Sequence, residues 1–390
     1  MIDKNSVIGI AGAGAMGSGI AQVAATAGHK VIILDTERTV LVASKSNLAK
    51  VMSRLVEKGK YSEEDSTEIQ KRITYTLDLQ YFENCNLIIE AIIENIEIKN
   101  KLFLEIEKVA PKDALITSNT SSLSIASIAS VLKDKSRCFG IHFFNPAPLM
   151  PLVEIIPSFS SDITLVESAK DLISAWGKST VLVKDTPGFI VNRLARPFYS
   201  EAIKMYEEGV ANFATIDHAM REVGGFKMGP FELMDFIGND VNYKVTASVF
   251  EQFFYDPRYK PSITQKRLFE SGFFGRKSGR GYYDYSDKAV QEKVNDDENL
   301  MDYIFHRIHV MLINEAVDAL FLKIASKEDL DTAMKKGVNY PKGLLEWADE
   351  IGLDIVLNSL TKLQDEFGED RYRPSPLLKK MVKEEKTFFD

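Results

Sequence analysis

The sequence predicts an α/β doubly wound sheet followed by two tandem all-α domains. Short apolar runs alternate with longer amphipathic stretches up to about residue 185, which is typical of a parallel sheet covered on both faces by helices. After Gly188 the short runs give way to long segments with helical periodicity. Within that helical region one stretch repeats another at a fixed spacing, which indicates a duplicated domain.

The predicted strands are short runs rich in β-branched and other apolar residues. Two of the stretches between them, 96–109 and 163–175, have the apolar spacing of amphipathic helices. The strands cover residues 7–11, 30–35, 86–91, 114–118, 138–143 and 180–183, and residues 151–156 form a further apolar run.

Breaks in this pattern predict where the domains end. The residues Asp185-Thr186-Pro187-Gly188 close the sheet domain, and a charged stretch separates the two helical domains. Helices are predicted over 190–209, 216–224 and 231–254, and an ordered loop over 272–285. We predict a sheet domain at 1–186, a first helical domain at 187–286, a linker at 287–298 and a second helical domain at 299–390.

The second helical domain is predicted to be a truncated copy of the first. With a shift of 114 positions and no gap, residues 201–240 share 12 identities in 40 positions with residues 315–354, where chance gives roughly two or three. Core packing alone explains the apolar identities. Acidic identities such as Glu201 with Glu315 predict paired polar contacts as well. The second copy ends before any counterpart of the tail at 275–285.

Composition and charge exclude several classes of protein. The chain is 45% hydrophobic and 27% charged, a composition that is not typical of disordered proteins. Its two cysteines, Cys85 and Cys138, lack metal-ligand spacing and indicate a reducing compartment. A net charge of -8 disfavours nucleic-acid binding, which needs a basic face. The uncharged stretch at 6–28 is too rich in glycine for a membrane span, and no basic segment precedes a cleavage site. We therefore predict a cytoplasmic protein without a signal peptide or a membrane partner.

A glycine-rich turn follows the first predicted strand. Gly12, Gly14 and Gly17 fit the pattern Gly-x-Gly-x-x-Gly, in which the glycines allow a tight turn, close approach of the backbone to a pyrophosphate and close packing of the next helix. Ala15 and Met16 open that helix, whose first N–H groups are free to bind phosphate. Glycines that serve packing alone are the alternative interpretation.

Asp35 ends the second predicted strand, 23 residues after Gly12. An acidic side chain at this point accepts hydrogen bonds from the adenosine ribose of NAD and repels the 2′-phosphate of NADP. The pattern therefore predicts an NAD-binding, Rossmann-type domain. An aspartate that only caps a surface turn is the alternative, and Arg38 leaves room for some use of NADP.

Of the five histidines, only His142 ends a predicted core strand of the sheet domain. Ligands of open α/β sheets lie beyond the carboxyl ends of the strands, so a base is useful at this position. Glu154 is the one carboxylate in the run 151–156, where an unpaired charge is costly. Pairing Glu154 with His142 satisfies both groups and fixes the imidazole tautomer. A structural histidine is the alternative, and no metal site is predicted because the chain has no His-Glu-x-x-His pattern.

Small polar residues follow the predicted strand at 114–118. The segment Ser118-Asn119-Thr120-Ser121-Ser122 either caps the next helix or holds a substrate oxygen and the carboxamide of the dinucleotide. The residue types alone leave both interpretations open.

Four segments together resemble the L-3-hydroxyacyl-CoA dehydrogenase family, which includes the 3-hydroxybutyryl-CoA dehydrogenases. The likeness runs in order from Val7 to about Tyr285, and residues 296–390 resemble the tandem C-terminal domains of multifunctional fatty-acid oxidation proteins. The four segments are GAGAMGSGIAQ (12–22), SNTSSLSI (118–125), GIHFFNPAPLMPLVE (140–154) and KDTPGFIVNR (184–193).

This resemblance implies an NAD-dependent enzyme that transfers hydride reversibly between C3 of an (S)-3-hydroxyacyl-CoA of short chain and NAD. It implies that His142 is the catalytic base, that Glu154 orients it, and that Ser121 and Asn192 contact the substrate. The implied cofactor contacts are Asp35, Glu94, Lys99, Ser121, Asn145 and Lys277. Two alternatives are a gulonate-type sugar-acid dehydrogenase and a non-enzymatic, crystallin-like NAD-binding protein.

The resemblance also bears on the acyl-CoA partner and on assembly. It places CoA near the basic helix after Asp35, which includes Lys50 and Arg54, although a solvated helix face explains these cations equally well. Single-copy relatives pair through their helical domains, so the tandem copy predicts a monomer that contains a pseudo-dimer, with a homodimer as the alternative. His306 takes the place of Asn192 in the second copy, which predicts that this copy has no catalytic role.

Overall fold

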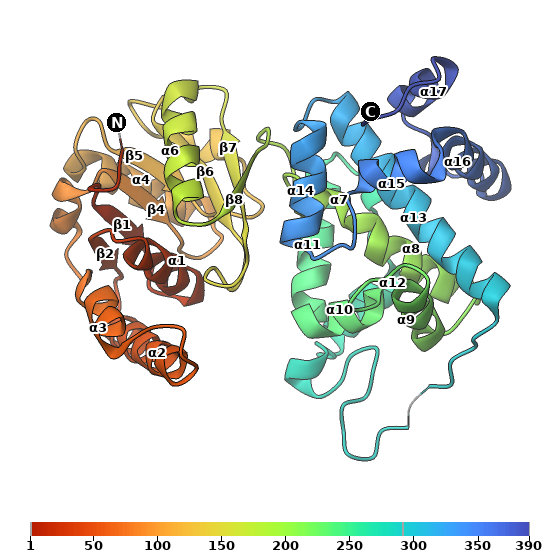
Figure 1. Cartoon of the computed structure of the whole chain (residues 1–390), viewed down its shortest axis with the longest axis horizontal. Coiled ribbons are helices and arrows are strands. Elements are labelled where there is room, and N and C mark those ends of the chain that lie inside the picture. The colour runs from red at the N-terminus through yellow and green to blue at the C-terminus, as the bar shows by residue number, and fades with distance from the viewer. Residues whose placement is uncertain (1, 291, 390) are drawn as a thin grey trace. The chain divides into compact units, whose positions relative to one another are not determined.

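The computed structural model describes residues 2–290 and 292–389, and it divides the chain into two compact units. The first unit ends at Phe189 and the second begins at Ile190. Every strand of the described residues lies in the first unit, coloured red to yellow in Figure 1, and the second unit is helical. The domain limits predicted within the second unit stay a prediction.

The first unit is built around one eight-stranded sheet with the strand order β3-β2-β1-β4-β5-β6-β7-β8. This order confirms the predicted doubly wound, Rossmann-type architecture. The strands are β1 Ile8–Ala11, β2 Val31–Leu34, β3 Ile73–Thr76, β4 Leu87–Glu90, β5 Leu115–Ser118, β6 Cys138–Phe143, β7 Leu152–Pro157 and β8 Ser179–Leu182. The helices are α1 Ala15–Thr26, α2 Arg38–Glu57, α3 Glu63–Lys71, α4 Ile96–Val109, α5 Ile125–Ala129 and α6 Ile163–Ala175, with a 3-10 turn η1 at Leu79–Asn84.

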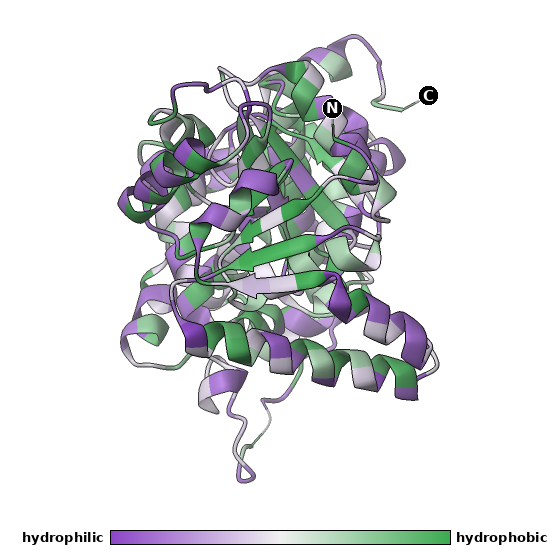
Figure 2. Cartoon of the chain, turned by 90° about the vertical axis from the view of Figure 1, so that its left-hand side faces the viewer, coloured by the Kyte–Doolittle hydropathy of each residue, from purple (hydrophilic) through white to green (hydrophobic). Residues whose placement is uncertain are grey.

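Helices cover both faces of the sheet, as predicted. Successive residues of each strand point to opposite faces, so Leu87 and Ile89 belong to one hydrophobic cluster and Ile88 belongs to another. In Figure 2 the strands are coloured mainly as hydrophobic, whereas the helices alternate between hydrophobic and hydrophilic residues. A sheet buried on both faces explains why the strands appear in the sequence as continuous apolar runs.

The sheet is not fully parallel, which corrects one prediction. β7 runs antiparallel to β6, and β8 runs parallel to β7. The connection over residues 144–151 is shorter than the dozen or so residues that a parallel crossover needs, so the chain returns directly beside β6. β3 was not predicted from the sequence because this edge strand, Ile-Thr-Tyr-Thr, contains no apolar run.

The second unit consists of helices in two successive sets. The predicted helix at 231–254 is two helices, since Gly238 adopts a φ of 106° between them. The predicted helix at 190–209 is divided at Ala195. The first set is α7 Val191–Leu194, α8 Arg196–Glu207, α9 Phe213–Glu222, α10 Pro230–Ile237, α11 Asn239–Gln252, η2 Pro257–Tyr259, α12 Ile263–Glu270 and η3 Arg276–Ser278. The second set is α13 Glu298–Phe321, α14 Lys327–Gly337, α15 Leu344–Ile351, α16 Leu353–Phe367, η4 Asp370–Tyr372 and α17 Pro376–Lys383.

The two sets repeat the same order of elements, which confirms the duplication. The shift of 114 positions takes the first residue of α9, α10 and α11 onto the first residue of α14, α15 and α16. The C-terminal part of α13 takes the place of α8, and α12 corresponds to α17 after a shift of 113. We call these two sets the first copy and the second copy.

Acidic residues kept in register do make paired contacts, as predicted. Glu315 accepts a hydrogen bond from Arg193 Nε at 2.6 Å, and Glu201 accepts one from Arg307 Nε at 2.7 Å. Each bond joins one copy to the other, and the shift of 114 converts the first pair into the second. This reciprocity is what a two-fold interface between identical subunits shows. Each glutamate also accepts a hydrogen bond from a tyrosine, Tyr259 or Tyr372.

The second copy does have a short counterpart of the first copy's tail, which corrects another prediction. Asp235 accepts hydrogen bonds from the backbone N–H groups of Tyr282 and Tyr283, at 3.0 and 2.9 Å. Asp349, its equivalent, accepts bonds from the backbone of Phe388 and Phe389 instead. The counterpart was missed because the two tails share aromatic residues but not their length.

Candidate active site

The glycine turn between β1 and α1 is shaped by backbone contacts that exclude larger residues. Gly12 has a φ of 108°, and a Cβ there would lie 2.6 Å from the carbonyl oxygen of Ala91. A Cβ on Gly17 would lie 1.9 Å from the carbonyl oxygen of Gly12, so helix and strand pack closely. A Cβ on Gly14 would meet no atom within 4 Å, which leaves the space that a pyrophosphate requires.

Two further observations fit NAD at this turn. Helix α1 has no side-chain cap, so the first N–H groups at Ala15 and Met16 stay available for phosphate oxygens. Asp35, directly after β2, accepts a hydrogen bond from Ala13 N at 2.8 Å and another from Glu37 N at 3.1 Å. Asp35 therefore also caps a local turn, and these bonds fix its carboxylate next to the glycine turn.

Beyond β4 and β5 lies a cluster of charged side chains that includes two predicted cofactor contacts, the exposed Glu94 and the buried Lys99. Glu94 Oε1 accepts hydrogen bonds from Ser121 N at 3.0 Å and from Ser122 N at 3.2 Å. Lys99, which is 1% exposed, contacts Glu94 at 3.2 Å and Glu90 at 2.5 Å. Burial raises the pKa of Glu94, but Lys99 and nearby hydroxyl groups outweigh it and hold that pKa below its usual range.

Glu90 is a member of this cluster that was not predicted. It ends β4 fully buried and accepts bonds from Ser118 Oγ at 2.6 Å and Ile92 N at 2.7 Å. The signal was present, because Glu90 is a single carboxylate in an apolar run, as Glu154 is. Lys99 lies between Glu90 and Glu94 and pairs with both. We therefore expect it to support cofactor binding indirectly, by holding the loop of Glu94 in place.

The polar segment after β5 does not cap the next helix, so that interpretation is wrong. Ser124 caps α5 instead, by accepting a hydrogen bond from Ser127 N. Asn119 Oδ1 accepts a bond from Phe143 N at 2.7 Å and so ties the end of β5 to the end of β6. Ser121 Oγ forms no hydrogen bond to a described residue, which leaves it available to a ligand.

Asp185 is a further structural residue that was not predicted. Its carboxylate accepts hydrogen bonds from the backbone N–H groups of Ile125 and Ala126, at 3.0 and 2.8 Å. It also accepts one from Ser124 Oγ at 3.2 Å. The segment that leads out of the sheet is therefore fixed to the start of α5.

The predicted pairing of His142 with Glu154 is confirmed. The two residues are opposite each other on β6 and β7, and His142 Nδ1 lies 2.7 Å from Glu154 Oε2. Both are buried, and the rings of Phe144 and Phe189 lie 4.5 and 5.8 Å from the imidazole, centre to centre. Because Nδ1 faces a carboxylate, the proton belongs on Nδ1 and Nε2 is left as the basic nitrogen. Nε2 has no hydrogen-bond partner among the described residues.

The remaining predicted site residues are spread over both units. Asn145 is exposed in the loop after β6. Asn192 is partly exposed in α7 of the second unit. Lys277, also in the second unit, lies in η3 and forms an ion pair with Asp240 at 2.5 Å. Their predicted roles toward cofactor and substrate stay predictions.

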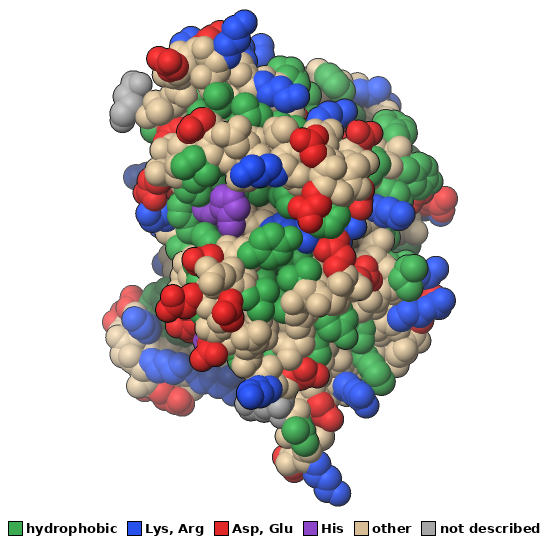
Figure 3. Space-filling model, turned by 90° about the vertical axis from the view of Figure 1, so that its right-hand side faces the viewer, with side chains coloured by type: hydrophobic (Ala, Val, Ile, Leu, Met, Phe, Trp, Pro, Cys, Tyr) green, Lys and Arg blue, Asp and Glu red, His purple; other side chains and the backbone are tan. Residues whose placement is uncertain are grey.

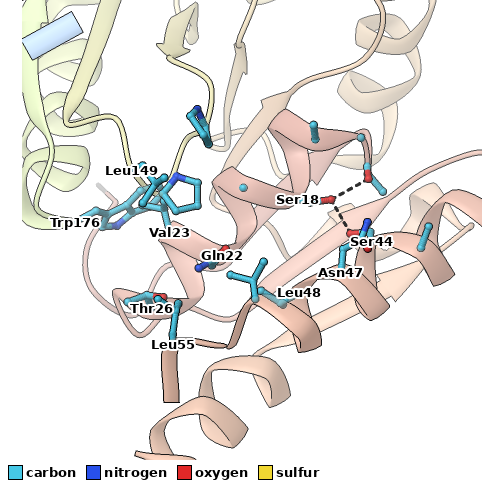
Figure 4. A pocket seen from close by; sticks show the side chains of 18 of the residues that line it. Ser18, Gln22, Val23, Thr26, Ser44, Asn47, Leu48, Leu55, Leu149 and Trp176 are labelled. Carbon is cyan, nitrogen blue, oxygen red and sulfur yellow. Dashed lines mark hydrogen bonds between the residues drawn. The ribbon is translucent and has the colours of Figure 1, made fainter. Parts of the chain in front are cut away.

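A groove of about 1090 Å³ opens between α1 and α2 (Figure 4). It extends from Gly14 in the glycine turn, past Pro146 and Leu149 in the loop after β6, to Lys60 beyond the end of α2. Lys60 and Lys178 are the cations that line it, whereas Lys50 and Arg54 are exposed on α2 outside the lining. Other lining side chains shown in Figure 4 are Ser18, Gln22, Val23, Thr26, Ser44, Asn47, Leu48, Leu55 and Trp176.

Within the described ranges, no group of three or more His, Cys, Asp or Glu side chains is placed to hold a metal ion. No described helix is long and apolar enough to cross a membrane. Positive and negative side chains are interspersed on the face displayed in Figure 3.

Comparison with known protein families decides the family. The NAD binding domain of 3-hydroxyacyl-CoA dehydrogenase matches residues 7–186, and the C-terminal domain of the same family matches residues 188–285 and 303–387. The chain belongs to the 3-hydroxyacyl-CoA dehydrogenase family. It is an NAD-dependent 3-hydroxyacyl-CoA dehydrogenase, and neither the sugar-acid nor the non-enzymatic alternative is favoured.

Several relatives of the family cover most of the chain. The match to the 3-hydroxyadipyl-CoA dehydrogenase of Escherichia coli K12 has 36% identity and spans 97% of this chain and 98% of that protein. The match to the human mitochondrial hydroxyacyl-coenzyme A dehydrogenase has 40% identity and spans 71% of this chain and 90% of that protein. The solved structure of a 3-hydroxybutyryl-CoA dehydrogenase from E. coli K12 has a TM-score of 0.92 and 34% identity, covering 98% of this chain and 99% of that one.

Proposed function

We propose that this dehydrogenase acts on a short (S)-3-hydroxyacyl-CoA, such as 3-hydroxybutyryl-CoA, and reduces acetoacetyl-CoA in the reverse direction. The observation that carries the proposal is the buried pair of His142 and Glu154 at 2.7 Å, beside the open glycine turn. A neutral imidazole with one nitrogen held by a carboxylate and the other unpaired is equipped to act as a general base. The short acyl chain is supported by the names of two bacterial relatives, which give 3-hydroxybutyryl-CoA as the substrate.

In this mechanism His142 Nε2 takes the proton of the 3-hydroxyl group, and in reverse the imidazolium returns it. Glu154 compensates the positive charge that forms on the ring and keeps the ring in its orientation. Ser121 Oγ donates a hydrogen bond to the 3-oxygen, and Asn192 contacts the substrate. NAD, when bound, supplies the carbon that accepts or returns the hydride.

The groove between α1 and α2 is our proposed site for the CoA part of the substrate. Its volume of about 1090 Å³ exceeds what a small hydroxy acid needs, and its lining includes Pro146, four residues from His142 in the sequence. Lys178 is held there by the carbonyl groups of Ala147 and Met150, at 2.6 and 2.8 Å, and has no carboxylate partner among the described residues. We therefore assign Lys60 and Lys178, in place of Lys50 and Arg54, as the groove's cations for phosphate.

The chain itself supplies a two-fold arrangement of helical copies, so we expect a monomer in solution. The support is the reciprocal pair of contacts, Arg193 with Glu315 and Arg307 with Glu201, across the two copies. Light scattering should give the mass of one chain. A dimer that persists on dilution would contradict the pseudo-dimer and favour the homodimer.

The activity is tested by NADH oxidation with acetoacetyl-CoA, with NADPH in parallel. We expect turnover that depends on NADH, and a His142→Gln variant that loses about 10²- to 10⁴-fold in kcat while its affinity for NADH stays nearly unchanged. Equal loss of turnover and NADH affinity would argue against a chemical role for His142. Absence of turnover with any acyl-CoA and either cofactor would overturn the proposed function.

A further inference from the structure

One buried arginine in the second unit has no acidic partner. Arg196, at the start of α8, is 5% exposed. Its Nε donates to the carbonyl oxygen of Asn192 at 2.9 Å, and its Nη1 donates to Thr246 Oγ1 at 3.0 Å. Its guanidinium lies 4.9 Å from the centre of the Tyr199 ring. No carboxylate of the described residues forms an ion pair with it.

The other buried arginines of this unit behave differently. Arg193, Arg307 and Arg371 each form an ion pair with a carboxylate, either Glu315 or Glu201. Burial lowers the pKa of Arg193 and Arg307, but their carboxylates and other hydrogen-bond partners more than restore it, so both pKa values are raised. Burial lowers the pKa of Arg196 without such compensation. A buried cation left in this state is costly unless an anion joins it.

The residues around Arg196 form a small polar cluster without charge of its own. Thr246 Oγ1, which accepts from Arg196, also accepts from Gln265 Nε2 at 3.1 Å. Gln265 Nε2 donates to Asn242 Oδ1 as well, at 2.5 Å. All four side chains are buried, and we call them the Arg196 cluster.

The second copy shows that the fold does not need this cluster. At the positions equivalent to Arg196, Asn242 and Thr246, after a shift of 114, it has Val310, Val356 and Leu360. At the position equivalent to Gln265, after a shift of 113, it has Leu378. All four of these side chains are buried and apolar, with exposed fractions of 0%. The same helices therefore pack around an ordinary hydrophobic core when no polar cluster is present.

The cluster also lies next to the predicted substrate contact of the second unit. Asn192 and Arg196 are four residues apart, on either side of the break at Ala195, and Arg196 Nε donates its hydrogen bond to the carbonyl oxygen of Asn192 at 2.9 Å. The copy that carries the substrate-contacting asparagine is thus the copy that carries the unpaired cation.

We propose that Arg196 binds a carboxylate at the far end of the acyl chain, so that the preferred substrate is a 3-hydroxy-dicarboxylyl-CoA. This inference rests on the proposed function and specifies its substrate class. The guanidinium supplies charge-assisted hydrogen bonds to the terminal carboxylate, and the three neutral residues of the Arg196 cluster hold the guanidinium in place through Thr246. An acyl chain that ends in a methyl group leaves the buried cation unpaired and binds less well in the transition state.

The test compares 3-hydroxyadipyl-CoA with 3-hydroxyhexanoyl-CoA, which have equal numbers of acyl carbons and differ in a terminal carboxylate or methyl group. The wild-type kcat/KM should be higher for 3-hydroxyadipyl-CoA. Arg196→Val installs the residue of the second copy, and it should lower kcat/KM for 3-hydroxyadipyl-CoA by about 100-fold while that for 3-hydroxyhexanoyl-CoA stays within about threefold. Arg196→Lys, which keeps the charge, should keep part of the preference.

Arg221→Met is the matched control, because Arg221 lies in the same copy and pairs with Glu232 while partly exposed. It should leave the ratio of the two kcat/KM values unchanged. A wild-type enzyme that favours 3-hydroxyhexanoyl-CoA would overturn the proposal without any variant. Equal loss on both substrates in Arg196→Val would overturn it too, since Arg196 would then only position Asn192. If the wild type turns over neither substrate nor acetoacetyl-CoA, the proposed function fails instead.

Discussion

The first and second helical copies keep the same caps but differ in the centre of their cores. In the first copy Asp217 accepts hydrogen bonds from the N–H groups of Phe231 and Glu232, both at 2.8 Å. In the second copy Asp331 does the same for the start of α15, at 2.9 Å. These buried aspartates satisfy the free N–H groups of a helix start, which every copy of the fold has to do.

Two of the differences fall at the predicted substrate contact and next to it. Asn192 becomes His306, which hydrogen-bonds Ser359 at 2.7 Å, and Arg196 becomes Val310. The duplication is thus an internal control: residues shared by both copies hold the fold, and polar residues unique to the first copy are candidates for function.

The largest expected effect concerns the glutamates that both copies share. Glu201→Ala and Glu315→Ala should each lower the free energy of unfolding by about 3–5 kcal/mol, because each removes a fully or almost fully buried carboxylate that pairs with a buried arginine. Arg193 and Arg307 then keep only the more exposed carboxylates of Asp318 and Glu208. Denaturant unfolding followed by circular dichroism gives both values. Glu350→Ala removes an exposed partner of Lys342 and should cost less than about 1 kcal/mol. A large loss in one copy and a small loss in the other would show that the copies are not equivalent.

A second comparison separates the copies by activity. Asn192→Ala should lower kcat/KM by about 100-fold, near 2.7 kcal/mol of transition-state stabilisation, because the proposed substrate contact is lost. His306→Ala, at the equivalent position, should leave kcat/KM within about twofold. Steady-state kinetics with acetoacetyl-CoA and NADH measures both variants. Comparable losses in both would mean that the second copy contributes to catalysis.

The sheet and the duplication were predictable because each leaves a periodic signal. Runs such as 7–11 are apolar throughout because both faces of the strand are buried. The repeat keeps a constant spacing of 114 residues, so its identities can be counted. The direction of β7 was not predictable from its residues, since an apolar run is the same in a parallel and in an antiparallel strand. It follows from the connection at 144–151, which is too short for a parallel crossover.

For the site, the sequence predicted a pair but not the support around it. His142 and Glu154 were paired because a single carboxylate in an apolar run needs a partner, and the same reasoning applied to Glu90 would have found the cluster with Lys99. Asp185 could not be found in this way, because its partners are backbone N–H groups that carry no residue-specific signal. The Arg196 cluster required both the contacts and the repeat, since it stands out only against its apolar equivalents.

The effect that is smallest per pH unit concerns His309 of the second copy, whose equivalent in the first copy is Ala195. His309 is 1% exposed, neither ring nitrogen has a partner among the described residues, and the Trp347 ring lies 4.2 Å away, centre to centre. Burial, aided by the charge of His306, lowers the pKa of His309 to about 3. Between about pH 6.5 and 3 the unfolded chain therefore binds a proton that the folded chain does not, and stability is lost as the pH falls.

His309→Phe keeps an aromatic ring in this place and removes the titration. In that pH window the wild type should lose up to about 1.4 kcal/mol more per pH unit than the variant, as measured by denaturant unfolding at a series of pH values. Above about pH 6.5 the two curves should run parallel, because His309 is neutral in both the folded and the unfolded chain. A difference that grows as the pH rises would have the wrong sign and would mean that His309 is charged in the folded protein, with an acidic partner close by.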